Sequence, residues 1–380
     1  MESENDGRVV TRAAKRKIMA SQLQTQQGNK KRVALGELTN LTDSISKSRR
    51  CIPLPSEQKR TESVKKPLLP KETGCKPAIC IGEKPFDHPR SDGQLEDSED
   101  PQMCASYSSD IYCYLRKLEV VQKRMPRSDY IESVQKDVTP NMRGMLVDWL
   151  VEVADEYRLL SETLYLTVNC IDRFLSITSL HRQKLQLLGV SAMLVASKYE
   201  EIKPPNVEDF CYITDNTYTK QEVLKMESDI LNALKFDLGN PTVKTFLRKL
   251  TRVAQQDFAS ESLQLEFLGC FLAELSLLDY KLVKFRPSMT AASVIFLARY
   301  VLRPNEFPWN PILQESSGYR AVDLQACASG LFDLYLGKRE GLHAVREKYR
   351  QHKYKWVSLT PSPNHIPTSY FEDYNPDDTL

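Results

Sequence analysis

The sequence holds little of the material from which catalytic loops and metal sites are usually built. Only 14 of its 380 residues are glycine, so loops that cradle phosphate groups have few places to form. The nine cysteines are scattered without a Cys-x-x-Cys pair, and the five histidines lie far apart. Nucleophile motifs are missing as well. We therefore expect no metal, no cofactor and no catalytic activity.

Long apolar runs are also missing. The most apolar stretches, such as residues 291–298, soon reach a charged residue, whereas a membrane span needs roughly 20 apolar residues. The amino-terminal residues are polar and charged, so we expect no secretory signal and no membrane association.

Aromatic residues are nearly absent from the first hundred positions. Phe86 is the only one before Tyr107, although the chain contains 3 Trp, 17 Tyr and 13 Phe. A segment that cannot bury large apolar side chains cannot offset the entropy lost when its backbone is ordered. We therefore predict a disordered regulatory tail over residues 1–103.

The formal net charge of +2 is unevenly distributed. Residues 1–103 hold 19 Lys/Arg and 15 Asp/Glu, which leaves 33 basic and 35 acidic residues, a net charge of −2, for the remainder. A nucleic-acid-binding domain usually has a strong basic excess. We therefore expect no specific nucleic-acid partner for the folded part of the chain.

Two basic clusters lie in the tail with 12 residues between them. They are Lys15-Arg16-Lys17 and Lys30-Lys31-Arg32. This spacing is typical of a bipartite nuclear import signal, and it predicts a nuclear protein with a cytoplasmic pool. The alternative is a solvated basic tail that binds nucleic acid weakly.

From Tyr107 onward, apolar residues recur with the 3.6-residue period of a helix. We therefore predict an all-α protein in which one leading helix, at about 107–118, precedes two sets of five helices. The first set is expected at about 140–157, 161–175, 183–200, 206–213 and 219–236, and the second at about 241–255, 261–278, 288–302, 309–315 and 320–337. The corresponding domains are 104–240 and 241–365, followed by a loose C-terminus at 366–380.

Local signals mark several helix ends. Thr139 and Asn240, each followed by proline, are typical of an N-cap residue before a first-turn proline. Ser161 is expected to cap the second helix of the first set. Thr219 and Glu222 predict a T-x-x-E capping box.

Four segments of the first set carry a family resemblance. They are MRGMLVDWLVEV at 142–153, TLYLTVNCIDRFLS at 163–176, LQLLGVSAMLVASKYEEI at 185–202 and YITDNTYTKQEVLKMESDIL at 212–231. In order and spacing they resemble the cyclin box, and the following hundred residues resemble the second cyclin fold. The YITDNTYT segment is more similar to A-type mitotic or S-phase cyclins than to B-type cyclins, and the short tail resembles the smaller plant A-type subgroup. One departure is Gly144-Met145, where the family usually has Ala-Ile.

The resemblance implies two tandem five-helix cyclin folds and a regulatory subunit rather than an enzyme. Such a subunit binds and activates a cyclin-dependent Ser/Thr kinase that carries a PSTAIRE-type helix, and so controls progression through S, G2 and M phases. The family's kinase-binding positions fall on Lys198, Tyr199, Glu201, Glu227, Ile111 and Tyr114. The alternatives are a surface ion pair for Lys198 and Glu227, and core positions for Tyr199, Ile111 and Tyr114.

The resemblance also implies a patch that docks the Arg-x-Leu motifs of substrates and inhibitors. Its residues are Met142, Met145, Leu146, Trp149, Glu152, Leu185 and Gln186. Glu152 would hold the basic residue of the motif, and Gln186 would hydrogen-bond its backbone. The apolar members share one helix face, which suits a groove for variable peptides and suits a core stripe as well.

Arg143 and Asp172 match a buried ion pair of the family that joins the first two helices. This role is structural, because removal of one partner leaves an uncompensated buried charge. We therefore expect a substitution of Arg143 to act through folding.

The tail contains Arg32, Leu35 and Asn40 in an R-x-x-L-x-x-x-x-N pattern. It resembles a destruction box, which the anaphase-promoting ubiquitin ligase reads. A bare R-x-x-L is uninformative, so the resemblance depends on Asn40, on the predicted disorder and on the cyclin box downstream.

Two alternatives stay open at this point. A B-type cyclin would have the same role, and a cyclin-fold transcription factor would bind nucleic acid, although the net charge of −2 disfavours it. Thr360 and Ser362, each followed by proline, are minimal phosphorylation sites, and the sequence does not say whether they are used.

Overall fold

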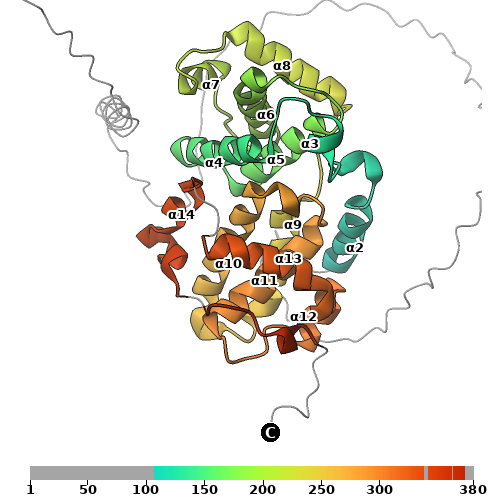
Figure 1. Ribbon diagram of the computed structural model, residues 1–380, viewed down its shortest axis with the longest axis vertical. Coiled ribbons are helices and arrows are strands. Elements are labelled where there is room, and N and C mark those ends of the chain that lie inside the picture. The colour runs from blue at the N-terminus through green and yellow to red at the C-terminus, as the bar shows by residue number, and fades with distance from the viewer. Residues whose placement is uncertain (1–106, 338–340, 362, 373–380) are drawn as a thin grey trace, which may run out of the picture. The chain divides into compact units, whose positions relative to one another are not determined.

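The computed structural model describes residues 107–337, 341–361 and 363–372 (Figure 1). Its regular elements are all helical, and no strand occurs among the described residues. The described residues belong to one compact unit. The predicted all-α fold class is therefore confirmed. The predicted tail, with its basic clusters and its R-x-x-L pattern, lies outside the described residues.

Five helices form the first repeat. They are α4 (Pro140–Glu156), α5 (Ser161–Leu175), α6 (Leu185–Glu200), α7 (Val207–Ile213) and α8 (Lys220–Ala233). α6 packs against the other four helices and buries every residue from Leu187 to Ser197. A helix that is apolar on all sides needs this central position. Gly189 lets α4 approach closely, because a Cβ there would lie 2.8 Å from Leu146 Cδ1.

The second repeat follows the same plan. Its helices are α9 (Val243–Gln255), α10 (Ser262–Leu278), α11 (Pro287–Leu302), α12 (Pro311–Ser317) and α13 (Ala321–Tyr335). Its third helix, α11, packs against α9, α10 and α13 and is buried from Thr290 to Val301. In Figure 1 these orange helices lie beside the green and yellow helices of the first repeat. The predicted pair of tandem five-helix folds is confirmed.

Among the described residues, three further helices flank the repeats, namely α2 (Ser108–Leu118), α3 (Tyr130–Ser133) and α14 (Ala344–Tyr349). α14 packs against α4 and α10. Asp148 of α4 accepts the backbone N–H groups of His343 and Ala344 at 3.2 and 3.0 Å. Lys348 Nζ donates to the buried Glu274 carboxylate at 2.7 Å. The C-terminal segment is therefore fastened to both repeats.

The segment from Ile366 to Glu372 differs from the loose C-terminus that the sequence suggested. Thr368–Phe371 forms a 3₁₀ turn. Phe371 is buried and stacks on Phe296 with 4.8 Å between ring centroids. Burial of an aromatic ring offsets the entropy of ordering a short proline-rich segment.

The predicted helix caps are half right. Thr139 caps α4 by accepting the Met142 N–H, and Thr219 with Glu222 forms the predicted capping box of α8. The prediction for Ser161 is wrong, because Ser161 is already the first helical residue of α5. Instead, Glu201 Oε1, from the end of α6, accepts the Leu160 N–H at 2.7 Å. A carboxylate at a helix N-terminus satisfies the same unpaired donors as a local cap.

The prediction for Asn240 is also wrong. Thr242 is the N-cap of α9 and forms a capping box with Thr245. The Asn240 amide donates to the Arg124 carbonyl at 2.8 Å and to Asn169 Oδ1 at 3.0 Å. Its side chain therefore joins the segment after α2 to α5, and this tertiary bonding takes it away from the helix end.

One buried ion pair joins four helices. Arg143 of α4 donates to both oxygens of Asp172 in α5, with both N···O distances at 2.7 Å. Tyr130 of α3 donates to the same carboxylate at 2.8 Å, and Arg143 Nη1 donates to the Leu277 carbonyl of α10 at 2.8 Å. Burial by itself would lower the pKa of Arg143, but the adjacent Asp172 and Tyr130 raise it above its ordinary value. The guanidinium therefore stays charged, and the pair links both repeats.

Arg143→Ala is expected to lower the free energy of unfolding by about 3–5 kcal/mol, because it leaves Asp172 buried without its cation. Denaturation by urea measures this loss. Arg127→Ala is the matched control, since Arg127 pairs with Asp129 at 3.2 Å while both side chains are more than half exposed. The control should cost less than about 1 kcal/mol. Equal costs for the two substitutions would contradict the structural role of Arg143.

Candidate partner-docking surfaces

A partly exposed ion pair joins the end of α6 to the middle of α8. Lys198 Nζ lies 2.6 Å from Glu227 Oε1, with 47% of the lysine side chain and 12% of the glutamate side chain exposed. A pair with a half-exposed lysine contributes little to stability in water. The two side chains can therefore give up their mutual contact at small cost when a partner docks. Lys198 would then donate to backbone carbonyls of the partner, and Glu227 would accept from its backbone amides.

Large apolar side chains extend this surface beyond the ion pair. Tyr199 is 55% exposed and Ile202 is 97% exposed. Ile202 is absent from the residues predicted to bind a partner, although the sequence carries a signal for it. The signal is an apolar residue between the charged Glu201 and Lys203 that belongs to no helical period. Glu201 itself accepts hydrogen bonds from Leu160 N and Thr163 Oγ1, and so holds the start of α5.

α2 lies with one face against the second repeat and the other face in solvent. Tyr112 is on the inner face, where its ring meets Phe246 edge-on at 5.7 Å and its hydroxyl donates to the Ser317 carbonyl at 3.3 Å. Burial raises the pKa of Tyr112 to about 12. Ile111 and Tyr114 are on the outer face and are 45% and 62% exposed. The structure therefore excludes both from the core.

The end of α2 is fastened by Glu119, whose side chain is fully buried. Its two oxygens accept the Ser288 N–H at 3.0 Å and the Ser288 hydroxyl at 2.6 Å, in the first turn of α11. Arg116 forms an ion pair with Glu119 and reaches the Tyr319 hydroxyl. Sequence reasoning missed this cluster, because Arg116 and Glu119 lie more than 150 positions before Ser288 and Tyr319.

α2 and α6 are joined through the turn at Gly239. Arg124, which follows α2, donates to the Gly239 carbonyl at 3.1 Å. The Tyr199 hydroxyl at the end of α6 occupies the other side of Gly239, since a Cβ there would lie 2.7 Å from it. The segment after α2 and the end of α6 therefore meet at Gly239. We refer to the outer face of α2, the end of α6 and the adjoining part of α8 together as the α2/α6/α8 surface.

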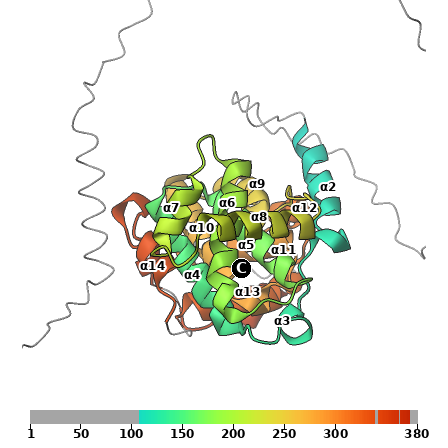
Figure 2. The same ribbon diagram turned by 90° about the horizontal axis from the view of Figure 1, so that it is seen from above.

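A second surface, which we call the α4/α6 surface, lies on α4 and the start of α6. Met145 is 49% exposed, whereas Leu146 and Leu185 are each only 6% exposed. The remaining predicted members are partly buried, and they are Met142, Trp149, Glu152 and Gln186. The predicted patch is therefore divided, because its two leucines belong to the core while the other residues are accessible. α4 lies on the opposite side of the described structure from α2 (Figures 1 and 2).

Other kinds of site find no counterpart in the part of the chain that the structure describes. No three His, Cys, Asp or Glu side chains gather there around a position for a metal ion. The described helices are also too short or too polar to cross a membrane. The residues of the predicted destruction box and import signal lie outside this part.

Comparisons with known proteins agree with this architecture. The model of the cyclin N-terminal domain matches residues 110–239, and that of the cyclin C-terminal domain matches residues 241–363. The fold is similar to that of a viral cyclin from herpesvirus saimiri, with a TM-score of 0.53 and 22% sequence identity over 59% of this chain and 96% of that chain.

Full-length relatives are considerably more similar. Cyclin-A3-4 of Arabidopsis thaliana is 52% identical over 375 residues, which is 98% of each chain. Cyclin-A3-1 of Oryza sativa subsp. japonica is 62% identical over 281 residues, covering 74% of this chain and 75% of the relative. A G2/mitotic-specific cyclin, C13-1 of Daucus carota, is 51% identical over 357 residues, covering 91% and 97%. The chain therefore belongs to the cyclin family, and its A-type character, predicted in preference to the B-type, is confirmed.

Proposed function

We propose that this A-type cyclin is the regulatory subunit of a cyclin-dependent Ser/Thr kinase with a PSTAIRE-type helix, which it binds and activates during the cell cycle. It catalyses no reaction itself. The observation that carries the proposal is the α2/α6/α8 surface, where large apolar side chains stand exposed beside an ion pair. Exposed apolar patches of this kind are typical of protein–protein interfaces. The cell-cycle role is also supported by the G2/mitotic-specific relative.

The surface is built to bind without rearranging. The buried Glu119 fixes α2 on the second repeat, and Glu201 fixes the junction between α5 and α6. Rigid presentation reduces the entropy lost on association. A signalling interface of this kind commonly buries about 2,000 Å² or more, which requires contributions from α2, α6 and α8 together.

Lys198→Ala with Glu227→Ala is expected to weaken kinase binding by roughly 10- to 100-fold, because charge-assisted hydrogen bonds to the kinase backbone are lost. Titration calorimetry with a purified PSTAIRE-type kinase measures the change. The matched control is Lys220→Ala with Glu208→Ala, which removes a second ion pair of 2.6 Å whose side chains are 54% and 64% exposed. If both double variants bind like the wild type, the proposed contact is wrong.

We further propose that the α4/α6 surface docks Arg-x-Leu motifs of substrates and inhibitors. Partly buried Met142 and Trp149 offer accessible apolar side chains on α4, and Glu152 adds a negative charge on the same helix. Leu146 and Leu185 are buried, so they belong to the core beneath this surface rather than to its accessible part. Adaptable methionines suit a groove that accepts different peptides.

Trp149→Ala should raise the KM for substrates that contain Arg-x-Leu and leave short peptides without the motif unchanged, because only the docking contact is lost. Steady-state phosphorylation of both substrate kinds separates the two effects. Trp356→Ala is the control, since this tryptophan is 48% exposed in the C-terminal segment. An equal loss on both substrate kinds would show that Trp149 acts through folding.

In the tail, we propose that Arg32, Leu35 and Asn40 form a destruction box for the anaphase-promoting ubiquitin ligase. We also propose that the two basic clusters direct nuclear import. The support for both is the sequence pattern together with the cyclin fold downstream.

Leu35→Ala with Asn40→Ala should prolong the half-life of the chain in extracts in which this ligase is active, and it leaves both basic clusters intact. Pulse-chase measurement with the wild-type chain as reference tests this. An unchanged half-life in the active extract would contradict the proposed destruction box. Nuclear accumulation of the same variant is the control, because its import signal is intact.

A further inference from the structure

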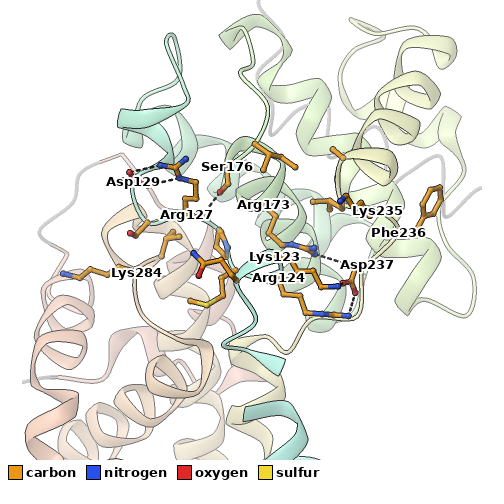
Figure 3. Close-up of a pocket in the computed structure, with 18 residues that line it drawn as sticks. Lys123, Arg124, Arg127, Asp129, Arg173, Ser176, Lys235, Phe236, Asp237 and Lys284 are labelled. Atoms are coloured by element: carbon orange, nitrogen blue, oxygen red, sulfur yellow. Dashed lines mark hydrogen bonds and ion pairs between the residues drawn. The ribbon is translucent and has the colours of Figure 1, made fainter. Parts of the chain in front are cut away.

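A large basic pocket lies outside the surfaces described so far. Its volume is about 1110 Å³, and it is bordered by residues 122–129 after α2, by the C-terminal ends of α5 and α8, and by Val283 and Lys284 (Figure 3). None of the partner contacts proposed above uses it. The pocket therefore needs an explanation of its own.

Positive charge dominates the lining of the pocket. Its cations are Lys123, Arg124, Arg127, Arg173, Lys235 and Lys284, and its only carboxylates are Asp129 and Asp237. The ends of α5 and α8 each carry roughly half a negative charge, so the two together balance about one cation. A positive excess of about three charges remains. Helix-end stabilisation therefore does not account for the accumulation.

Three of these cations converge on Asp237, two on its carboxylate and one on its backbone carbonyl (Figure 3). Arg124 and Lys123 both form ion pairs with Asp237. Arg173 donates to the backbone carbonyl of Asp237 at 2.8 Å. A single carboxylate with charge −1 leaves this group with a charge of +2, which equals in magnitude the charge of a phosphoryl dianion.

Arg173 is the most confined member of the group. It is only 4% exposed, and its Nε finds no hydrogen-bond partner among the described residues. Burial lowers its pKa, Cys170 and Asp237 partly offset this effect, and Arg124 lowers the pKa further. A guanidinium buried without an ion-pair partner is costly, and an anion in the pocket would reduce that cost.

Beside the cations, the turn after α8 presents an aromatic ring. Lys235 and Phe236 both adopt positive φ angles, 53° and 58°, and Phe236 is 67% exposed. Non-glycine residues in this conformation are strained and concentrate at functional sites. An exposed ring beside a cationic group suits a ligand with both an anionic and an apolar part.

From this arrangement we propose that the pocket binds a phosphorylated serine or threonine within a partner polypeptide. The phosphoryl oxygens contact the cations around Asp237, and Phe236 packs against an apolar residue near the phosphorylated one. Clusters of arginine and lysine are a common means of phosphopeptide recognition. A single compact charge centre suits a phosphorylated side chain better than the extended backbone of a nucleic acid, which needs a continuous basic surface.

The test is fluorescence anisotropy with the full chain and a fluorescein-labelled degenerate peptide pool that carries a central phosphoserine. The same pool with a central serine is the reference. We expect the phosphorylated pool to bind at least roughly tenfold more tightly, as a charge-assisted contact to a phosphoryl group implies. Because no kinase is present in this assay, a lack of binding would contradict the pocket proposal without bearing on kinase activation.

Lys123→Glu with Arg127→Glu should remove this preference. Their side chains are 74% and 52% exposed, so the substitutions do not disturb the core. Lys225→Glu with Arg252→Glu makes the same charge change at exposed positions outside the pocket, and it should preserve the preference. Thermal unfolding checks that both double variants fold, and the single Lys123→Ala is a milder second variant.

Three results would overturn the proposal. The first is equal binding of the phosphorylated and unphosphorylated pools. The second is a preference that survives Lys123→Glu with Arg127→Glu, or that disappears equally in the control. The third is competition by inorganic phosphate or by an oligonucleotide as strong as that by the unlabelled phosphopeptide pool, which would mark a general anion site.

Discussion

The arrangement of both repeats depends on the buried pair of Arg143 and Asp172. The bidentate bond joins α4 to α5, the Tyr130 hydroxyl brings α3 to the same carboxylate, and the Leu277 carbonyl extends the contact to α10. Charges in such a place are tolerated only when every lone pair and proton has a partner. α4 carries one proposed docking surface, and α10 belongs to the repeat that carries α2. The pair therefore fixes the framework on which both surfaces stand.

The two proposed surfaces are built differently. On α4, docking residues alternate with core residues, so Leu146 packs beneath Gly189 while Met145 faces solvent. On α2 the division runs along the helix, with Tyr112 and Glu119 turned inward and Ile111 and Tyr114 turned outward. A substitution on α4 therefore risks loss of stability together with loss of docking. On the outer face of α2 the two effects are separable.

Much of the fold could be predicted from the sequence, because the information was local. The apolar period predicted each helix of both repeats, and Thr139 and Thr219 marked helix starts through bonds to residues three positions away. The wrong caps have a common cause. Ser161 and Asn240 look like caps locally. The Glu201 carboxylate at the end of α6 instead bonds the start of α5, and tertiary hydrogen bonds occupy the Asn240 side chain.

The candidate surfaces were predicted less completely, because exposure and contacts between distant segments are set by the fold rather than by local sequence. Family positions indicated Lys198 and Glu227, and the structure brings them to 2.6 Å. The same positions did not distinguish the buried Leu185 from its accessible neighbours. Ile202 was missed because an isolated apolar residue belongs to no periodic pattern. The basic pocket was missed because its cations come from segments that only the fold brings together.

The most direct test of this account is the rate of phosphate transfer from ATP to a short peptide without Arg-x-Leu, catalysed by a purified PSTAIRE-type kinase. Increasing amounts of the wild-type chain should raise this rate until it saturates at one chain per kinase. The opposite result would be a chain that is fully helical by circular dichroism, yet neither co-elutes with the kinase nor changes its rate.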